Sequence, residues 1–269
     1  MDANATFEGP APSATALRRV LRLGNRVAQS LISREFRRRY DADLDGTVYV
    51  DELGLEHDGG YAFYLGSLWL PTLLALRRAR LGNDDVLADL GAGKGLVLLL
   101  AASLRIRRVV GVELSQRLAD IARRNVERNR HRQRAQSVDV ASVDALDWDI
   151  PDDLSVVYLY CPFWGEPFRA VMTRLFEAVE RRSSPLRIIY NYPWEHNWLV
   201  SSGKVRVLDV APAEWPWRPR WWMRSEVIVT YGVGQGPFPK PRGLRPSSAA
   251  LARWSGCLLY TSPSPRDRS

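Results

Sequence analysis

Short apolar runs alternate with longer amphipathic segments between residues 85 and 192, and this alternation restricts the fold of the chain more than any other feature. The apolar runs read VLADL, RVVGVEL, SVDV, SVVYLYC and LRIIYNY, and helix-like segments separate most of them. Runs of four to eight apolar residues are typical of strands that are buried on both faces. Strands that alternate with helices predict an α/β fold with a parallel sheet between two helical layers.

Two further apolar runs, KVRVLDV and SEVIVTYGV, bring the predicted sheet to seven strands. The segment between them, APAEWPWRPRWWMR, is too short and too rich in proline for a crossover helix, so we expect an antiparallel hairpin at the sheet edge. Its tryptophans and arginines could stack on bases, dock on a lipid interface, cover a pocket or pack under the sheet. Upstream, YAFYLGSLWLPTLLALRRA predicts a helix that begins near Pro71, because proline suits a first helical turn.

Composition divides the chain into four parts. Residues 1–60 form an N-terminal helical extension with an acidic turn, 61–235 the α/β domain, and 236–256 a Gly/Pro-rich tail. In the extension, apolar residues from Leu17 to Phe36 recur at helical spacing between arginines, and packing against the α/β domain is favoured over membrane or nucleic-acid contact. The stretch CLLYTSPSPRD within 257–269 reads as translated sequencing-adapter DNA, so we expect it to be a scar outside the fold.

Charge and targeting signals limit the partners and the compartment. The formal net charge is +8, which is compatible with nucleic acid or an anionic surface as a partner. The two cysteines give neither a disulfide framework nor a metal-ligand cluster, and no apolar run is long enough to cross a bilayer. The N-terminus MDANATFEGP lacks a secretory signal, so we expect a cytoplasmic protein.

A glycine-rich loop from Asp89 to Gly95, DLGAGKG, lies between the first predicted strand and its helix. Glycines at this place let the backbone approach a ligand closely and expose the amino end of the helix. The loop is not a Walker loop, because GxxxxGK[ST] is absent, and Leu96 replaces the third glycine of the dehydrogenase fingerprint. Further acidic residues follow the next strands, with Glu113 at the end of the second and Asp144 after the third.

The stretches DLGAGKGLVLLLAA, RVVGVELS and VDAL resemble class I S-adenosylmethionine-dependent methyltransferases over about residues 86–192. The likeness is closest to a group of bacterial methyltransferases and weaker to the Dot1-type lysine methyltransferases. The resemblance implies a Rossmann-like seven-stranded sheet and S-adenosyl-L-methionine as cofactor. It implies that the loop residues Gly91, Ala92, Gly93 and Gly95 wrap the methionine moiety. It further implies that Asp89 binds the amino group, Glu113 the ribose hydroxyls, and Asp144 with the Ala145 backbone the adenine.

The fourth strand end, where such proteins usually bind the methyl acceptor, reads YCPFW from Tyr160 to Trp164. Amino-directed members often have Asn or Asp at the position of Cys161, and a thiol is a weak hydrogen-bond acceptor. This departure argues against methylation of the nucleic-base amine type. We expect Cys161, Pro162 and Phe163 to shape the pocket wall and Tyr64, in a region that covers the cofactor in related proteins, to lie near the pocket.

Methyl transfer needs a general base only if the acceptor arrives protonated. The candidate catalytic residues are Tyr160, at the fourth strand end, and His196, which begins the helix after the fifth strand. His196 could equally be a helix cap or a surface residue. The sequence does not specify the methyl acceptor. We rank a protein lysine first, a small metabolite second and RNA third.

The segment DADLDGTVYVDE matches a calcium-loop pattern, with candidate ligand oxygens on Asp41, Asp43, Asp45 and Glu52. The following LGLEHDGG is a poor exit helix, and no second calcium hand is present in the sequence. We therefore favour a turn that leads into the cofactor cover and expect no bound metal. A non-enzymatic protein that binds calcium or a polyanion is the rival interpretation.

Overall fold

The computed structural model describes residues 31, 34–44, 69–182, 184–212 and 227–240. The chain divides into two units, Met1–Asp41 and Ala42–Ser269. In the first unit residues 34–39 are helical, and the rings of Phe36 and Tyr40 stack with centroids 4.6 Å apart. Most of the predicted amphipathic helix lies outside the described residues, as do Tyr64, Asp45, Glu52 and the tryptophan-rich connection. No helix in the described part of the chain is long and apolar enough to cross a membrane.

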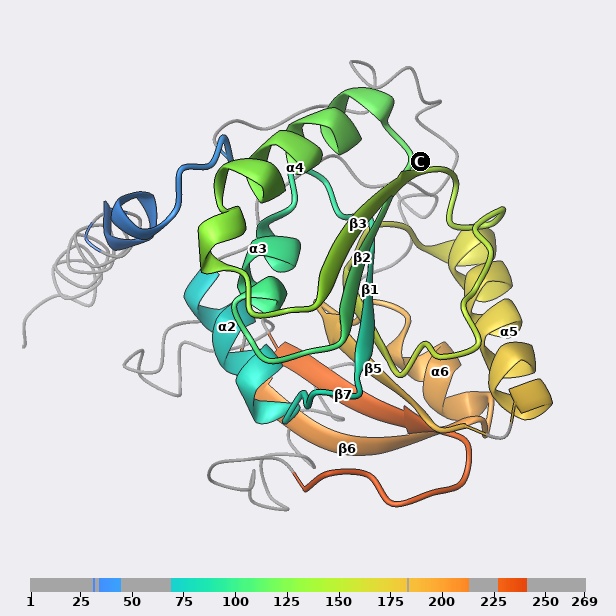
Figure 1. Cartoon of the computed structure of the whole chain (residues 1–269). Coiled ribbons are helices and arrows are strands. Elements are labelled where there is room, and N and C mark those ends of the chain that lie inside the picture. The colour runs from blue at the N-terminus through green and yellow to red at the C-terminus, as the bar shows by residue number, and fades with distance from the viewer. Residues whose placement is uncertain (1–30, 32–33, 45–68, 183, 213–226, 241–269) are drawn as a thin grey trace, which may run out of the picture. The chain divides into compact units, whose positions relative to one another are not determined.

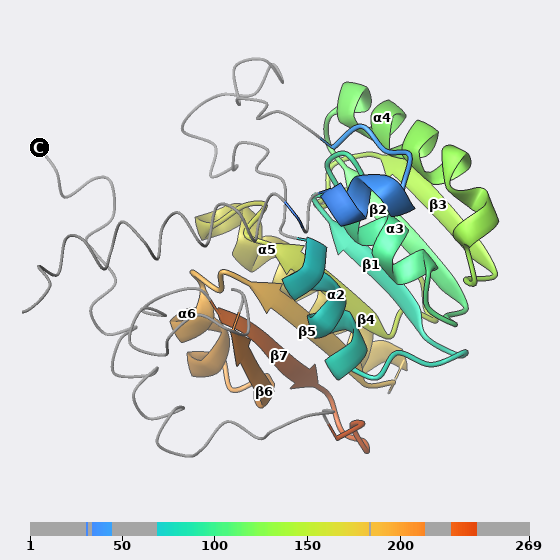
Figure 2. The same cartoon turned by 90° about the vertical axis from the view of Figure 1, so that its left-hand side faces the viewer.

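The second unit contains a seven-stranded sheet with the strand order β3-β2-β1-β4-β5-β7-β6 (Figure 2). The strands β1 to β5 are parallel, whereas β7 runs antiparallel to both of its neighbours. Their bounds are β1 Val86–Leu90, β2 Arg108–Glu113, β3 Ser137–Ser142, β4 Val156–Tyr160, β5 Leu186–Asn191, β6 Val205–Pro212 and β7 Val227–Val233. The predicted seven-stranded α/β sheet with an antiparallel hairpin at one edge is confirmed.

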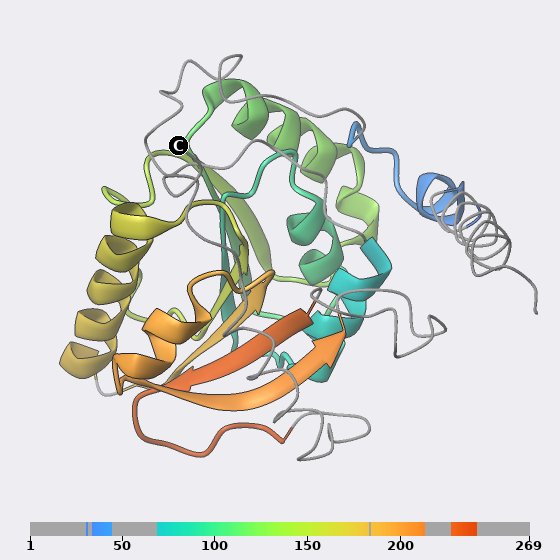
Figure 3. The same cartoon turned by 180° about the vertical axis from the view of Figure 1, so that it is seen from behind.

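Helices cover both faces of this sheet (Figures 1 and 3). One face carries α2, α3 and α4, and the other carries α5 and α6. The bounds are α2 Trp69–Arg78, α3 Leu96–Ala102, α4 Gln116–Arg128, α5 Gly165–Arg182 and α6 His196–Ser201, with a short 3₁₀ turn η2 at Arg130–Arg132. All seven residues of α3 are buried because this helix contacts the sheet, α2 and α4.

An ion pair connects the outer strand of the edge hairpin to α2. In β6 the pairing register shifts between Val207 and Asp209, and the Asp209 carboxylate is buried. Arg78, in the last turn of α2, donates to both Asp209 oxygens at 2.9 and 2.8 Å. A buried carboxylate needs such a bidentate partner, so α2 and the outer strand are held together.

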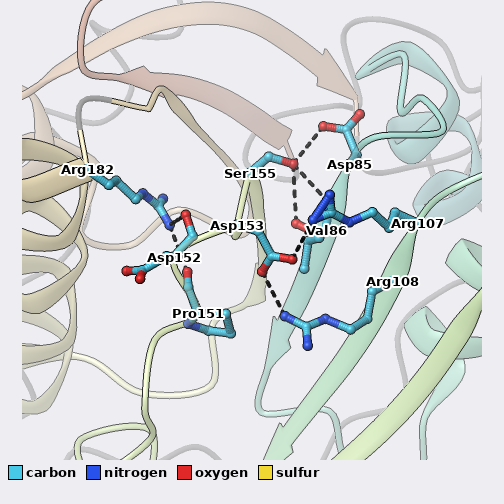
Figure 4. Close-up of polar contacts among 9 residues, drawn as sticks. All are labelled: Asp85, Val86, Arg107, Arg108, Pro151, Asp152, Asp153, Ser155 and Arg182. Atoms are coloured by element: carbon cyan, nitrogen blue, oxygen red, sulfur yellow. Dashed lines mark hydrogen bonds and ion pairs between the residues drawn. The ribbon is translucent and has the colours of Figure 1, made fainter.

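Polar side chains also connect the amino ends of β1, β2 and β4 (Figure 4). Ser155 donates to Asp85 at 2.7 Å, and Arg187 from the start of β5 pairs with the same carboxylate. Asp153 accepts from Arg107 and Arg108, each at 2.8 Å. Arg182 at the end of α5 donates to the carbonyl oxygens of Pro151 and Asp152. This amino edge is therefore occupied by structural ion pairs, and the ligand-binding groups must be sought at the carboxyl edge.

Candidate functional site

Three polar side chains from neighbouring strands lie on the same face near the carboxyl edge. Strand pairing places Asp89 of β1 opposite Gly111 of β2 and Tyr158 of β4. Glu113 stands two residues after Gly111, and side chains alternate between the faces of a strand, so Asp89, Glu113 and Tyr158 share one face. This is the face of α3, because a Cβ added to Gly111 would lie 2.7 Å from Leu98 of that helix.

The loop between β1 and α3 depends on glycine at three positions. Gly91, Gly93 and Gly95 have φ values of +79°, +54° and +85°, in the left-handed region that other residues rarely adopt. A Cβ on Gly91 would lie 2.5 Å from Pro162 Cβ, so this loop touches the loop that follows β4. A Cβ on Gly95 would lie 3.1 Å from Ala122 of α4. The predicted loop between strand and helix is confirmed, and it is packed on two sides.

Glu113 braces this glycine loop from the end of β2. Its Oε2 accepts a hydrogen bond from the Gly93 N–H at 2.7 Å, and its Oε1 accepts one from Ser115 N–H at 2.9 Å. Burial raises the pKa of Glu113, although these backbone donors oppose the effect. The family resemblance implied that Glu113 binds a ribose, whereas its structural role in holding the glycine loop was not predicted.

Asp89 is the most deeply buried acid at this edge, with 2% of its surface exposed. Within the described residues, its carboxylate takes part in none of the hydrogen bonds or ion pairs. Burial, and then the nearby negative charge of Glu113, raise the pKa of Asp89 well above its ordinary value. A cationic ligand at this place would supply the missing partner and favour the ionised carboxylate.

Asp43 and Lys94 join the segment that follows the first unit to the glycine loop. Lys94 Nζ lies 3.1 Å from Asp43 Oδ1. The buried Asn125 of α4 accepts from Asp43 N–H and donates to the carbonyl oxygens of Asp43 and Lys94, each at 2.9 Å. Asp43 thus serves as an anchor between this segment and the glycine loop, and the residues of the predicted turn that follow Asp43 from residue 45 lie outside the described ranges.

The other calcium-loop candidates give no metal site in the described residues. Asp41 belongs to the first unit, and Asp45 and Glu52 lie outside the described ranges. No group of three or more His, Cys, Asp or Glu side chains in the described part of the chain could hold a metal ion. The expectation that this segment binds no calcium stays a prediction to be tested.

The turns after β4 and β5 have the same unusual backbone. Cys161 and Tyr192 each follow the last residue of a strand and precede a proline, and their φ values are +44° and +53°. Non-glycine residues seldom adopt this conformation, and those that do cluster at functional sites. The rings of Tyr160 and Tyr192 meet edge to face, 5.5 Å apart. The two turns therefore form one aromatic edge. This edge lies beside the glycine loop, because Gly91 of the loop packs against Pro162 of the first turn.

The residues predicted to shape the pocket wall separate in the structure. Pro162 lies against the glycine loop, whereas Phe163 is buried in the core on the opposite side and packs against Phe168 of α5. Burial and the Glu195 carboxylate raise the pKa of the Cys161 thiol to about 12, although the Tyr190 hydroxyl opposes this. Cys161 is therefore a neutral thiol at neutral pH, and its role in the pocket wall stays a prediction.

His196 and Tyr160, the two candidate catalytic residues, lie on different faces of the sheet. His196 is buried, and its Nδ1 lies 2.6 Å from the hydroxyl of Tyr231, which pairs with Ile188 on the α5 side. Burial lowers the pKa of His196 to about 4. Tyr160 stands two residues after Tyr158 and shares its face. The base role of His196 stays a prediction, and its contacts are those of a packing residue.

The loop after β3 holds the predicted adenine contacts. Asp144 Oδ1 accepts from Leu146 N–H at 2.8 Å, which closes a local turn. The carbonyl oxygen of Ala145 accepts from Arg174 of α5 at 3.0 Å. Both residues are half-buried and stand one strand away from Glu113. Their role toward a cofactor stays a prediction.

Asn191 and Tyr158 form a buried polar pair that was not predicted from the sequence. Asn191, the last residue of β5, is 3% exposed and donates from Nδ2 to the Tyr158 hydroxyl at 3.4 Å. The same hydroxyl lies 3.3 Å from Thr72 Oγ1 of α2. Asn191 Oδ1 is buried and has no hydrogen-bond partner within the described residues. The sequence signal was a polar residue at the end of a largely apolar strand.

Comparison with known proteins gives one family model and one curated relative of direct interest. The model described as "Histone methylation protein DOT1" matches residues 66–150, which include the glycine loop, Glu113 and Asp144. The "Probable ribosomal RNA small subunit methyltransferase A" of Methanopyrus kandleri is 28% identical over 85 residues. That match covers 32% of this chain and 28% of the relative. The chain therefore matches less than a third of the relative's length.

Solved structures of similar fold are more distant. An RNA methyltransferase from Salinibacter ruber, in complex with S-adenosyl-L-homocysteine, is 22% identical, with a TM-score of 0.43 over 64% of this chain and 97% of that protein. A ribosomal protein L11 methylase from Lactobacillus delbrueckii subsp. bulgaricus is 14% identical, with a TM-score of 0.47 over 66% of this chain and 84% of that protein.

Proposed function

We infer that this chain is a class I S-adenosylmethionine-dependent methyltransferase, and we propose that the cofactor binds at the carboxyl ends of β1, β2 and β3. The observation that carries this proposal is the buried Asp89 carboxylate beside a glycine loop that Glu113 holds in place. The strand order, the resemblance of the motifs and the match of residues 66–150 to a methyltransferase family model support it.

The groups at this edge fit the chemistry of S-adenosylmethionine. The ligand carries an ammonium and a sulfonium charge, and Asp89 is a buried carboxylate without a partner among the described residues. Glu113 uses one lone pair of each oxygen for Gly93 and Ser115, which leaves further acceptor positions for the ribose hydroxyls. Asp144 and Ala145 stand at the next strand end, where the adenine would follow the ribose.

Methyl transfer requires few catalytic groups from this chain. When bound, S-adenosylmethionine supplies an electrophilic methyl group on a positively charged sulfur. The glycine loop and Asp89 orient the donor, and the aromatic edge formed by Tyr160 and Tyr192 holds the acceptor and excludes water. Holding two reactants at attack distance is a large part of such a rate enhancement, so no general base is needed for a neutral acceptor.

S-Adenosylhomocysteine binding tests the cofactor assignment. Titration calorimetry with the intact chain should give a saturable binding curve, and Asp89→Ala should abolish it. Asp149→Asn, at an exposed position after β3, is the matched control and should bind like the unchanged protein. Lack of binding by the intact chain would refute the function.

For the acceptor, we propose RNA in preference to a lysine side chain. The side chains that end β4 and β5 and begin the turns at this edge are uncharged, namely Tyr160, Cys161, Asn191 and Tyr192, and the nearby Glu195 carboxylate accepts from Gly165 N–H. A lysine ammonium would need a carboxylate there, whereas a neutral nitrogen or hydroxyl would not. The net charge of +8 and the ribosomal RNA methyltransferase relative add support for a polyanionic substrate.

Transfer of a labelled methyl group identifies the acceptor. The protein is incubated with a cell extract and S-adenosylmethionine that carries a tritiated methyl group, and the products are divided into samples treated with ribonuclease or with protease. Loss of the macromolecular label after ribonuclease treatment alone is the expected result. Loss after protease treatment alone would show a protein acceptor instead.

A further inference from the structure

We propose that the side-chain oxygen of Asn191 accepts a hydrogen bond from an uncharged N–H group of the methyl acceptor. This inference rests on the methyltransferase function proposed above and names the residue and the acceptor chemistry of the same site. Asn191 would thus take over the task for which Cys161, at the neighbouring strand end, is poorly suited, because a thiol is a weak acceptor.

The first support is the state of the amide in the structure. Asn191 is 97% buried, since 3% of its surface is exposed, and its Oδ1 has no partner in the described part of the chain. Buried amide oxygens nearly always accept a hydrogen bond, because leaving one without a partner destabilises the fold. Such a group at the end of a strand indicates that its partner is a ligand.

The orientation of the amide is the second support. Its Nδ2 is used by the Tyr158 hydroxyl at 3.4 Å, and that hydroxyl in turn lies 3.3 Å from Thr72 Oγ1. A hydroxyl can donate one hydrogen bond while it accepts another, so Tyr158 can donate to Thr72 and accept from Asn191. In this arrangement the nitrogen of the amide is used by Tyr158, and the oxygen is left for the acceptor.

The third support is the position of Asn191 relative to the cofactor groups. Asn191 pairs with Tyr160, and Tyr158 pairs with Asp89, so β1, β4 and β5 bring these side chains to one face of the sheet. Asn191 also immediately precedes Tyr192, whose left-handed backbone forms the aromatic edge. Ligands bind beyond the carboxyl ends of parallel strands, and the amide stands at that end of β5, on the same face as Asp89.

The charge at this edge determines which acceptors fit. A neutral amide oxygen next to Cys161 and Tyr192 cannot compensate a buried positive charge, as a carboxylate would. It suits the N–H of a nucleobase or another uncharged nitrogen. The inference therefore predicts selectivity for neutral nitrogen over a protonated amine.

Methyl transfer to RNA provides a direct probe of this oxygen. The RNA fraction of a cell extract serves as acceptor, with S-adenosylmethionine that carries a tritiated methyl group. We compare the rate of transfer, and the affinity for S-adenosylhomocysteine measured by titration calorimetry, in the intact protein and in Asn191→Leu. Asn191→Leu should lower the rate of transfer by about threefold to tenfold, the range for one lost hydrogen bond between uncharged groups. The affinity for S-adenosylhomocysteine should stay the same.

A conservative variant separates the oxygen from the rest of the amide. Asn191→Asp retains an acceptor oxygen at the same place and should keep most of the transfer rate. If Asn191→Asp loses the rate as fully as Asn191→Leu, the oxygen is not the binding group and the inference is wrong. An unchanged rate in Asn191→Leu, with S-adenosylhomocysteine still bound, also refutes it and leaves the methyltransferase function intact. If the unchanged protein binds S-adenosylhomocysteine but transfers no methyl group to RNA, the inference fails alone. If it neither binds S-adenosylhomocysteine nor transfers methyl groups, both proposals fail.

Thermal unfolding distinguishes ligand binding from a structural role. Asn125 is an equally buried asparagine whose side chain is hydrogen-bonded on both its oxygen and its nitrogen. Asn125→Leu should lower Tm clearly, whereas Asn191→Leu should leave Tm unchanged or raise it, because it removes a buried oxygen without a partner. Failure of Asn191→Leu to fold, or a fall in Tm like that of Asn125→Leu, would show a structural asparagine and overturn the proposal.

Discussion

At the scale of the single residue, Asp89 shows how a stability cost can mark a binding group. The side chain is almost fully buried, faces the charge of Glu113, and has no hydrogen-bond partner in the described part of the chain. An ionised carboxylate in such a place is unfavourable, and its raised pKa reflects this cost. Replacement by a neutral isostere would remove the cost, so its presence is explained by a ligand rather than by folding.

The raised pKa of Asp89 gives a pH dependence whose sign can be tested. A carboxyl group with a raised pKa binds more protons in the folded than in the unfolded state, so stability decreases as pH rises from about 4 through the folded pKa. Asp89→Asn should therefore be more stable than the unchanged protein at pH 8 and nearly equal to it at pH 4. Urea unfolding at the two pH values, without ligand, measures the difference. A variant that is less stable at pH 8 would contradict this account.

At the scale of the element, the glycine loop is held from three sides. Pro162 packs against Gly91, Glu113 accepts from Gly93 N–H, and Ala122 of α4 contacts Gly95. The loop is therefore rigid before any ligand arrives, and little conformational entropy is lost on binding. The seven-residue helix α3 that follows is buried throughout, which fixes the loop at its other end.

Two glycines with similar backbones allow the packing of this loop to be measured. Gly91 and Gly203 have φ values of +79° and +67°, but a Cβ on Gly203 would meet no atom within 4 Å. Gly203→Ala should cost about 1 kcal/mol from the left-handed backbone alone. Gly91→Ala adds a clash with Pro162 and should cost about 3 kcal/mol in total. Equal losses of unfolding free energy in the two variants would show that Pro162 does not press on the loop.

The opposite end of β1 supports stability instead of binding. Asp85 accepts hydrogen bonds from Ser155, Gly82 N–H and Arg187. Burial raises the pKa of Asp85, but the hydrogen bond and charge of Arg187 outweigh this, and the pKa lies below its ordinary value. A lowered pKa gives stability that is present above pH 4 and is lost as pH falls through the folded value.

Asp85→Asn should consequently lower the unfolding free energy at pH 7 by about 3 kcal/mol, because Arg187 is left buried without its charge partner. The loss should shrink below pH 4, where Asp85 of the unchanged protein also becomes protonated. Denaturant unfolding at pH 7 and pH 3 measures both values. Asp152→Asn, at an exposed position of the same edge, is the control and should be neutral. A loss for Asp85→Asn that does not depend on pH would contradict the ion-pair explanation.

At the scale of the whole molecule, the sequence predicted which segments form strands, but it predicted the order of the strands in the sheet only in part. Strands that are buried on both faces consist largely of apolar residues, so β1, β2, β4 and β5 could be recognised in the sequence. That β7 pairs with β5, leaving β6 outside, was not predicted, although the signal existed. In β7 all residues but the first are buried, whereas β6 retains exposed side chains such as Arg206.

A residue of the candidate site could be predicted when its position at the end of one strand was sufficient. A residue whose role depends on contacts between several segments could not be predicted. The places of Asp89 and Glu113 follow from the rule that parallel strands end at a common edge. The bond from Gly93 to Glu113 and the orphan oxygen of Asn191 depend on side-chain directions in segments far apart in the sequence. His196 attracted attention through its chemistry, but its contact with Tyr231 across the sheet could not be read from the sequence.

Residues distant in the sequence hold the acidic segment at Asp43, and these contacts bear on whether the segment is a turn or a calcium loop. Asn125 binds the backbone of Asp43 on both sides, and Lys94 pairs with the Asp43 carboxylate. Asn125→Ala should lower the unfolding free energy by about 3 kcal/mol, because it leaves the N–H and two carbonyl groups without partners. Asp43→Ala should cost less than about 1 kcal/mol, since the pair is half exposed on its acidic side.

Calcium then provides the deciding measurement. If Lys94 is the partner of Asp43, millimolar calcium should change Tm in neither the unchanged protein nor Asp43→Ala, and a chelator should have no effect. A calcium loop would instead raise Tm in proportion to the logarithm of the calcium concentration, and Asp43→Ala would lose this rise. Because Lys94 lies inside the glycine loop, any calcium-dependent release of Asp43 would also alter the affinity for S-adenosylhomocysteine. Calorimetry with and without calcium should show equal affinities, whereas a difference would make the acidic segment a regulator of the site.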